Sequence, residues 1–119
     1  MAKNLEIAML FDFYGGLLTA KQQEAVDLYY NNDLSLAEIA ENQGITRQGV
    51  RDAVKRAESQ LLEMEAQLGL VARFRRMNRT IRDIGAAAED ILAANQAVGS
   101  AAIGKSADAI LRLSKKLDD

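Results

Sequence analysis

The chain has 119 residues with no cysteine and no histidine, which excludes disulfides, thiol catalysis, the usual zinc sites and the commonest general base. Hydrophobic residues make up 49% of the sequence, which excludes a disordered chain, and the absence of proline favours helix throughout. The formal net charge is −2, and the apolar stretch of residues 5–18 is interrupted by Glu6 and Asp12. We therefore predict an all-α cytoplasmic protein without a signal peptide or a membrane span.

Two helices are predicted in the first quarter of the chain. The first covers residues 5–14 and is expected to end at Gly15 and Gly16. Four of its residues are expected to form its apolar surface: Leu5, Met9, Phe11 and Phe13. A capping box made by Thr19 and Gln22 predicts the start of the second helix.

Residues 35–56 predict a helix-turn-helix. Ser35 and Glu38 form a second capping box, which starts one helix. Gly44 can take the positive φ at which that helix ends, and Thr46 caps the next helix. Six apolar residues fall where two helices joined by a short turn bury them: Leu36, Ile39, Ala40, Ile45, Val50 and Val54. At Ala40 we expect room for little more than a methyl group.

Two seams of apolar residues, spaced by three and four, follow the turn. The first seam consists of Val50, Val54, Ala57, Leu61, Met64 and Leu68. The second consists of Phe74, Met77, Ile81, Ile84, Ala88 and Ile91. We expect Gly69 to join them into an antiparallel hairpin. A last helix over residues 105–117, after a loop around Gly99 and Gly104, is expected to cover the open side of that hairpin within the chain or in a partner molecule.

These elements predict two domains. A helix-turn-helix domain covers residues 1–69, and a C-terminal helical extension over residues 70–119 packs on it. The two seams, residues 50–68 and 74–91, also suggest a homodimer, although three helices within one chain could bury both seams. The monomer therefore stays open as an alternative.

Residues 99–106 match the phosphate-loop pattern G-x-x-x-x-G-K-[ST] at every fixed position. That loop needs a buried strand before it, so that backbone N–H groups and the lysine, here Lys105, converge on the phosphates. The preceding residues are alanine-rich and helical in pattern. We therefore predict no nucleotide hydrolysis, and more generally no enzyme, no cofactor and no metal.

Charge is segregated along the chain. Residues 1–45 carry two basic and seven acidic residues, a net charge of −5, whereas residues 46–82 carry nine basic and four acidic residues, a net charge of +5. Any one of these basic residues could simply lie on a solvated helix face. Together they predict a surface for phosphates or for an acidic protein partner. The predicted site residues are Arg47, Gln48, Arg51, Lys55, Arg73, Arg75, Arg76, Arg79 and Arg82.

Several segments carry a resemblance to known families. Residues 18–23, 28–30 and 34–40 and Arg56 resemble region 4 of bacterial sigma factors. A closer resemblance to the YlxM family lies in residues 10–14, 17–19, 21–22 and 46–50, followed by Asp52 and Arg56. This resemblance implies a sigma-region-4-like helix-turn-helix fold, and a role with the GTPase and the RNA of the signal recognition particle.

Two functions are therefore weighed. In the first, which we favour from the sequence, the protein is a non-enzymatic accessory factor of the signal recognition particle pathway that binds the particle's GTPase, its RNA, or both. In the second, it is a DNA-binding transcriptional regulator whose helix from Thr46 to Arg56 enters the major groove. The strongly acidic first 45 residues count against the second function.

Overall fold

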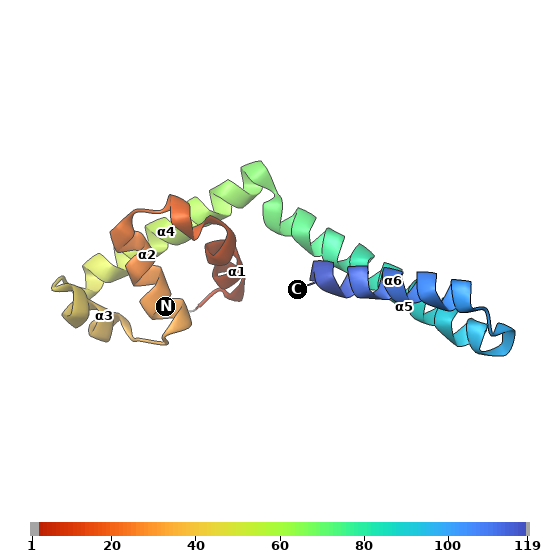
Figure 1. The fold of residues 1–119 in the computed structure, drawn as a ribbon. Coiled ribbons are helices and arrows are strands. Elements are labelled where there is room, and N and C mark those ends of the chain that lie inside the picture. The colour runs from red at the N-terminus through yellow and green to blue at the C-terminus, as the bar shows by residue number, and fades with distance from the viewer. Residues whose placement is uncertain (1–2, 119) are drawn as a thin grey trace. The chain divides into compact units, whose positions relative to one another are not determined.

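The computed structural model describes residues 3–118, and the described residues form helices and no strand, which confirms the all-α prediction. The chain divides into two compact units, Met1–Val71 and Ala72–Asp119. The elements are α1 (Leu5–Tyr14), the 3₁₀ turn η1 (Gly15–Leu17), α2 (Ala20–Val26), the π turn η2 (Asp27–Asn31), α3 (Leu36–Gln43), α4 (Arg47–Leu68), α5 (Leu70–Val98) and α6 (Ala101–Asp118). Figure 1 labels the α-helices.

The predicted caps set the starts of the helices. Ser35 Oγ accepts from the Glu38 backbone N–H at 3.1 Å, and the Glu38 carboxylate accepts from the Ser35 N–H at 3.1 Å. Gly44 ends α3 with φ 69°, and Thr46 Oγ1 accepts from the Gly49 N–H at the start of α4. The helix-turn-helix is therefore present, with its turn where the glycine predicts it.

Of the four residues predicted for the apolar surface of α1, Met9 and Phe11 pack against the core, but Leu5 and Phe13 do not. The helix buries Ile7, Leu10 and Tyr14, whereas Leu5 is 86% exposed and Phe13 is 38% exposed. Spacings of three and four place Ile7, Leu10 and Tyr14 on one stripe of the helix. Leu5, Met9 and Phe13 are also spaced by four, so periodicity allowed either stripe, and only the packing shows which one is buried.

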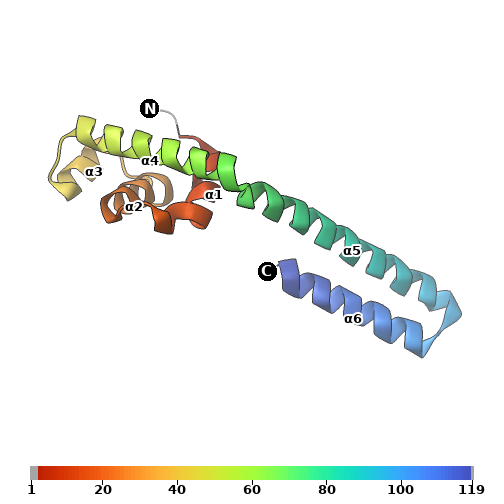
Figure 2. The same cartoon turned by 90° about the horizontal axis from the view of Figure 1, so that it is seen from above.

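Helix α4 forms the centre of the first unit. Four residues of the first seam, Val50, Val54, Ala57 and Leu61, are fully buried. The helix contacts α1, α2 and α3, which lie along it in Figure 2. The first seam is therefore buried in the core of this unit as far as Leu61, whereas Leu68 at its end is 56% exposed.

The second unit is an antiparallel hairpin of α5 and α6, which lie side by side in Figures 1 and 2. The chain reverses at Gly99, where φ is 68°. Ser114 Oγ donates to the Ile81 carbonyl at 2.7 Å across the hairpin. The second seam is predicted to pair with the first across Gly69. Within its own unit only Ala88 of that seam is buried and Ile81 is half-buried, whereas its other residues, Phe74, Met77, Ile84 and Ile91, stay exposed. Gly104 was also misplaced, because α6 begins before it and the glycine lies inside the helix.

Candidate nucleic-acid interface

Three basic side chains form a ridge on the first half of α4, which we call the basic ridge: Arg47, Arg51 and Lys55. They recur every four residues, so they lie above one another on one side of the helix. All three are exposed, and none makes a salt bridge with the described part of the chain. Val50 and Val54 hold the helix in place from the buried side. The ridge is therefore a rigid row of positive charge open to a partner.

A shallow hollow lies beside the basic ridge, where the beginnings of α3 and α4 come together. Its lining consists of Ser35, Leu36, Ala37, Arg47, Gln48 and Arg51. Gln48 donates to the Asp52 carboxylate at 2.9 Å, one turn along α4. Hydrogen bonds from the Ser35 backbone and side chain lower the pKa of Glu38, which holds a negative charge in the first turn of α3. The hollow therefore presents two arginines and an amide, and two carboxylates, those of Glu38 and Asp52, directly follow residues of its lining in the sequence.

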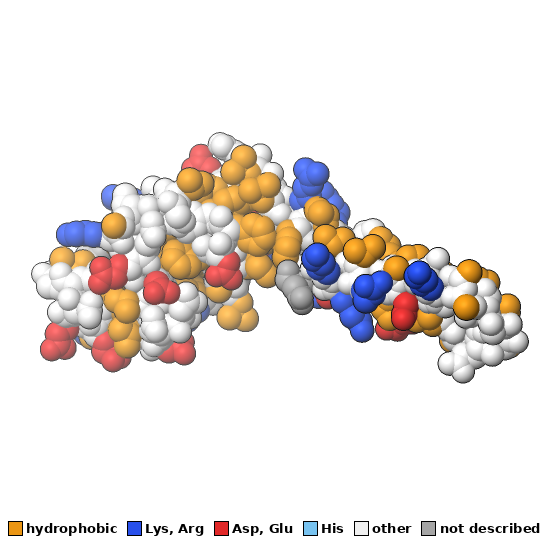
Figure 3. Space-filling view, viewed as in Figure 1, with side chains coloured by type: hydrophobic (Ala, Val, Ile, Leu, Met, Phe, Trp, Pro, Cys, Tyr) orange, Lys and Arg blue, Asp and Glu red, His pale blue; other side chains and the backbone are white. Residues whose placement is uncertain are grey.

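The other predicted site residues all lie on the first half of α5 and are exposed: Arg73, Arg75, Arg76, Arg79 and Arg82. Arg73 and Arg76 line an open groove, and Arg82 pairs with Asp118 of α6 at 3.5 Å. These five arginines belong to the second unit, whereas the basic ridge belongs to the first. The predicted site is thus divided between two units, and Figure 3 shows Lys and Arg side chains on both.

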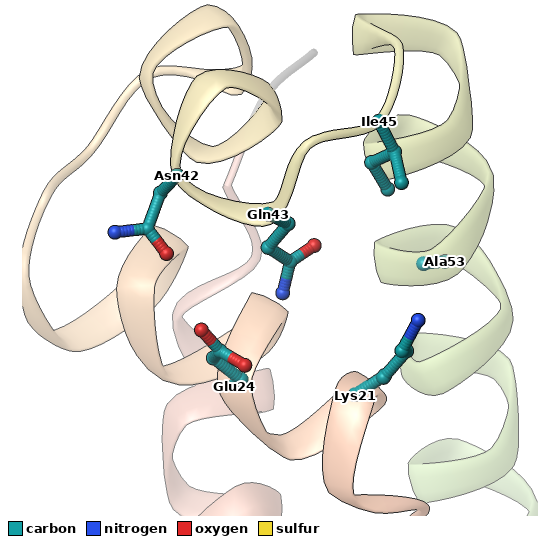
Figure 4. Close-up of a pocket in the computed structure, with 6 residues that line it drawn as sticks. All are labelled: Lys21, Glu24, Asn42, Gln43, Ile45 and Ala53. Carbon is teal, nitrogen blue, oxygen red and sulfur yellow. The ribbon is translucent and has the colours of Figure 1, made fainter.

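A pocket that the sequence did not predict lies behind the turn of the helix-turn-helix (Figure 4). Its lining consists of Lys21, Glu24, Asn42, Gln43, Ile45 and Ala53. Figure 4 shows the Lys21, Glu24 and Gln43 side chains directed towards the same space, and Gln43 Nε2 is buried without a hydrogen-bond partner. The residues come from α2, α3, the turn and α4, so no local motif marks them. Only the packing of these elements brings them together.

The remaining chemical signals are weak. Gly104, Lys105 and Ser106 lie within α6 and follow a helix instead of a strand, so the phosphate-loop match has none of the required geometry. Among residues 3–118, no group of three acidic, histidine or cysteine side chains is placed to hold a metal ion. None of the described helices is both long and apolar enough to cross a membrane.

Comparison with known proteins now places the chain in a family. Residues 1–117 match a family model described as "Putative helix-turn-helix protein, YlxM / p13 like" and named UPF0122. A UPF0122 protein of Acetivibrio thermocellus is 57% identical over 74 residues, which are 62% of this chain and 63% of the relative. The UPF0122 protein STH1464 of Symbiobacterium thermophilum is 45% identical over 96 residues, which are 79% of this chain and 90% of the relative. The match to the family model over residues 1–117 shows that the protein belongs to the YlxM/p13-like helix-turn-helix family.

Proposed function

We propose that the chain is a non-enzymatic nucleic-acid-binding protein that contacts duplex DNA through the basic ridge of α4. One observation carries the proposal. Arg47, Arg51 and Lys55 are exposed without salt bridges to described residues, on the second helix of a helix-turn-helix. In this motif the second helix lies in the major groove and its N-terminal residues reach the base edges.

The start of α4 has the groups that such docking needs. Arginine side chains such as Arg47 and Arg51 can donate two parallel hydrogen bonds to a guanine edge, and a glutamine such as Gln48 can pair with adenine. Gln48 is now bonded to Asp52, so reading a base would exchange that hydrogen bond for one to the DNA. Lys55, two turns along the helix, would meet a phosphate and add affinity without sequence information.

The family supports this proposal over our first interpretation of the sequence. Its description names a helix-turn-helix, a motif whose best-known use is DNA binding. The role in the signal recognition particle pathway, which the sequence favours, rests on the resemblance, whereas the description of the family names only the helix-turn-helix. A fold by itself decides no function, so a direct test is needed.

The excess of acidic residues in the first part of the chain supports a second candidate function. Residues 1–45 carry seven acidic and two basic residues, and they belong to the same unit as the basic ridge. These acidic residues would repel a long duplex more than they would repel a protein surface. This favours a protein partner, such as the GTPase of the signal recognition particle, as the alternative to DNA; the particle's RNA, the other partner that the resemblance implies, would be repelled as DNA is.

Binding measured with fluorescent duplex DNA, after selection from a random pool, tests the proposal. We expect sequence-selective binding that weakens steeply with salt, and about a tenfold loss of affinity for Arg51→Glu. Lys21→Glu makes the same charge change in the same unit away from the ridge, so it serves as the control. Feeble DNA binding together with capture of the signal recognition particle that depends on Arg51 would establish the second candidate instead. The absence of both activities would refute both.

A further inference from the structure

The α5–α6 hairpin has an apolar face that its own two helices leave open. We call it the outer seam, and it consists of Met77, Ile84, Ile91, Ile103, Ile110, Leu113 and Leu117. Each of these side chains is between 40% and 65% exposed. Four of them, with Ile81 and Ser114, line a groove that is almost wholly apolar. Water therefore faces a continuous row of large aliphatic side chains.

The contact between α5 and α6 is made by small residues, which leaves the large aliphatic side chains exposed to solvent. Among the described residues of this unit, the buried ones are Gly85, Ala88, Ala107 and Ser114. A Cβ added at Gly85 would lie 2.9 Å from Ser114 Oγ, so α5 and α6 approach closely there. Such a contact buries little apolar area, and two helices this thinly packed need further cover to be stable.

Charge along α5 indicates what covers the outer seam. Residues 70–82 carry five arginines and no acidic residue, whereas residues 83–98 carry three acidic residues and no basic one. Two parallel copies of this helix would place arginines against arginines. Two antiparallel copies would place the basic half of each against the acidic half of the other.

We propose that a second copy of the chain covers the outer seam, with the two α5 helices antiparallel. Met77, Ile84 and Ile91 recur every seventh residue, the repeat by which two helices pack along a seam. With Ile84 near the two-fold axis, Met77 of one copy lies level with Ile91 of the other. In this register Arg76 lies about 3 Å along the axis from Asp90 of the second copy, because each residue advances a helix by about 1.5 Å.

The pairing is self-complementary, as a two-fold interface requires. Arg76 and Asp90 are both exposed, and neither makes a salt bridge within the described chain, so both are open to a partner. This proposal narrows the homodimer suggested by the sequence. Four residues of the first seam, Val50, Val54, Ala57 and Leu61, are buried inside the first unit, so the proposed dimer contact uses the outer seam of the α5–α6 hairpin.

Sedimentation of the full-length chain at micromolar concentration tests the pairing through charge reversal. We expect a species of twice the 13.0 kDa chain mass. Arg76→Asp should weaken dimerisation by about tenfold, because two-fold symmetry reverses two contacts at once. Asp90→Arg should do the same, and the double variant should restore the dimer. Arg112→Asp, the same charge change at an exposed site of α6, is the control and should have little effect.

Cross-linking provides an independent measurement, because the natural chain has no cysteine. Ile84→Cys should form a disulfide-linked dimer on mild oxidation, since residues at the two-fold axis lie close enough for the bond. Ala86→Cys is an exposed site on the opposite side of α5 and should cross-link far less. A chain that stays monomeric overturns the proposal, and so does a dimer that is indifferent to Arg76→Asp or that cross-links equally at both sites.

Discussion

Tyr14 and Glu65 together fix the junction between α4 and α5. The Tyr14 hydroxyl donates to the Glu65 carboxylate at 2.6 Å and accepts from the Leu70 N–H at 3.1 Å. The same carboxylate oxygen accepts from the Val71 N–H at 3.0 Å. The first N–H groups of α5 have no carbonyl acceptor within their own helix. Side chains of α1 and α4 accept their hydrogen bonds instead. Burial, and the hydrogen bond to Glu65, raise the pKa of Tyr14.

Tyr14→Phe tests this junction. The variant keeps the buried ring but leaves the Leu70 N–H without an acceptor and Glu65 without its donor, so we expect the melting temperature to fall by several degrees. Glu65→Ala should have a similar effect. Glu63→Ala, an exposed site on the same helix, should leave the melting temperature nearly unchanged. Equal effects of the two glutamate variants would contradict the assignment.

Ala40→Leu tests the packing of the helix-turn-helix. Ala40 is 6% exposed and packs with Ile39, Val50 and Val54, so a larger side chain would overpack the contact. We expect a loss of about 1–3 kcal/mol in unfolding free energy, measured by urea denaturation. Ala37→Leu places the same side chain at an exposed site of α3 and should cost little. An unchanged stability in Ala40→Leu would show that the contact is not close-packed.

Alkaline pH should destabilise the first unit through Tyr30. Burial, and a hydrogen bond donated to Glu58 at 2.7 Å, raise the pKa of Tyr30 from 10.0 to about 12. Above the ordinary tyrosine pKa, Tyr30 releases its hydroxyl proton in the unfolded chain but keeps it in the folded chain. The contribution of protonated Tyr30 to the stability of the folded state is therefore full below pH 10 and is lost as the pH rises towards 12. Denaturation midpoints between about pH 9 and pH 11 measure the loss. Tyr30→Phe should show a smaller decline than the natural chain, and equal slopes would contradict this account.

Lys105 should have no role in nucleotide chemistry. It lies on α6 within a continuous helix, where no phosphate-binding loop can form. We expect neither the natural chain nor Lys105→Ala to bind a fluorescent ATP or GTP analogue, or to hydrolyse the nucleotide. Turnover that disappears in Lys105→Ala would show that the phosphate-loop match is functional.

Local signals in the sequence were sufficient for the starts of α2, α3 and α4 and for the ends of α3 and α4, but not for the start of α6. Ser35 with Glu38, and Thr19 with Gln22, each form both hydrogen bonds of a capping box, because all the groups involved lie within one turn. The basic ridge was equally accessible, since spacing by four residues alone places side chains on one side of a helix. What the ridge binds stays a prediction.

Contacts between elements that lie far apart in the sequence could not be predicted from the spacing of apolar residues. The seam spacing did not show which side of α5 faces α6, because small residues make that contact: a Cβ added at Gly85 would lie 2.9 Å from Ser114 Oγ, and of the seam only Ala88 is buried. Gly99 and Gly104 were equal candidates for the reversal. Gly99 makes the turn, with a positive φ, and the Asn95 side chain holds it through two hydrogen bonds to the Ser100 backbone. The pocket behind the turn was missed for the same reason.

Helix α4 bears the basic ridge on its exposed side and the core of the first unit on its buried side. Anything that binds the ridge therefore binds only the folded chain, and binding and folding are thermodynamically linked. A ligand at a hundred times its dissociation constant would add about 2.7 kcal/mol to the stability of this unit. Thermal shift can thus find a ligand before its identity is known. By the same linkage, a substitution at buried Val54 that partly unfolds the unit would lower the apparent affinity without touching the partner.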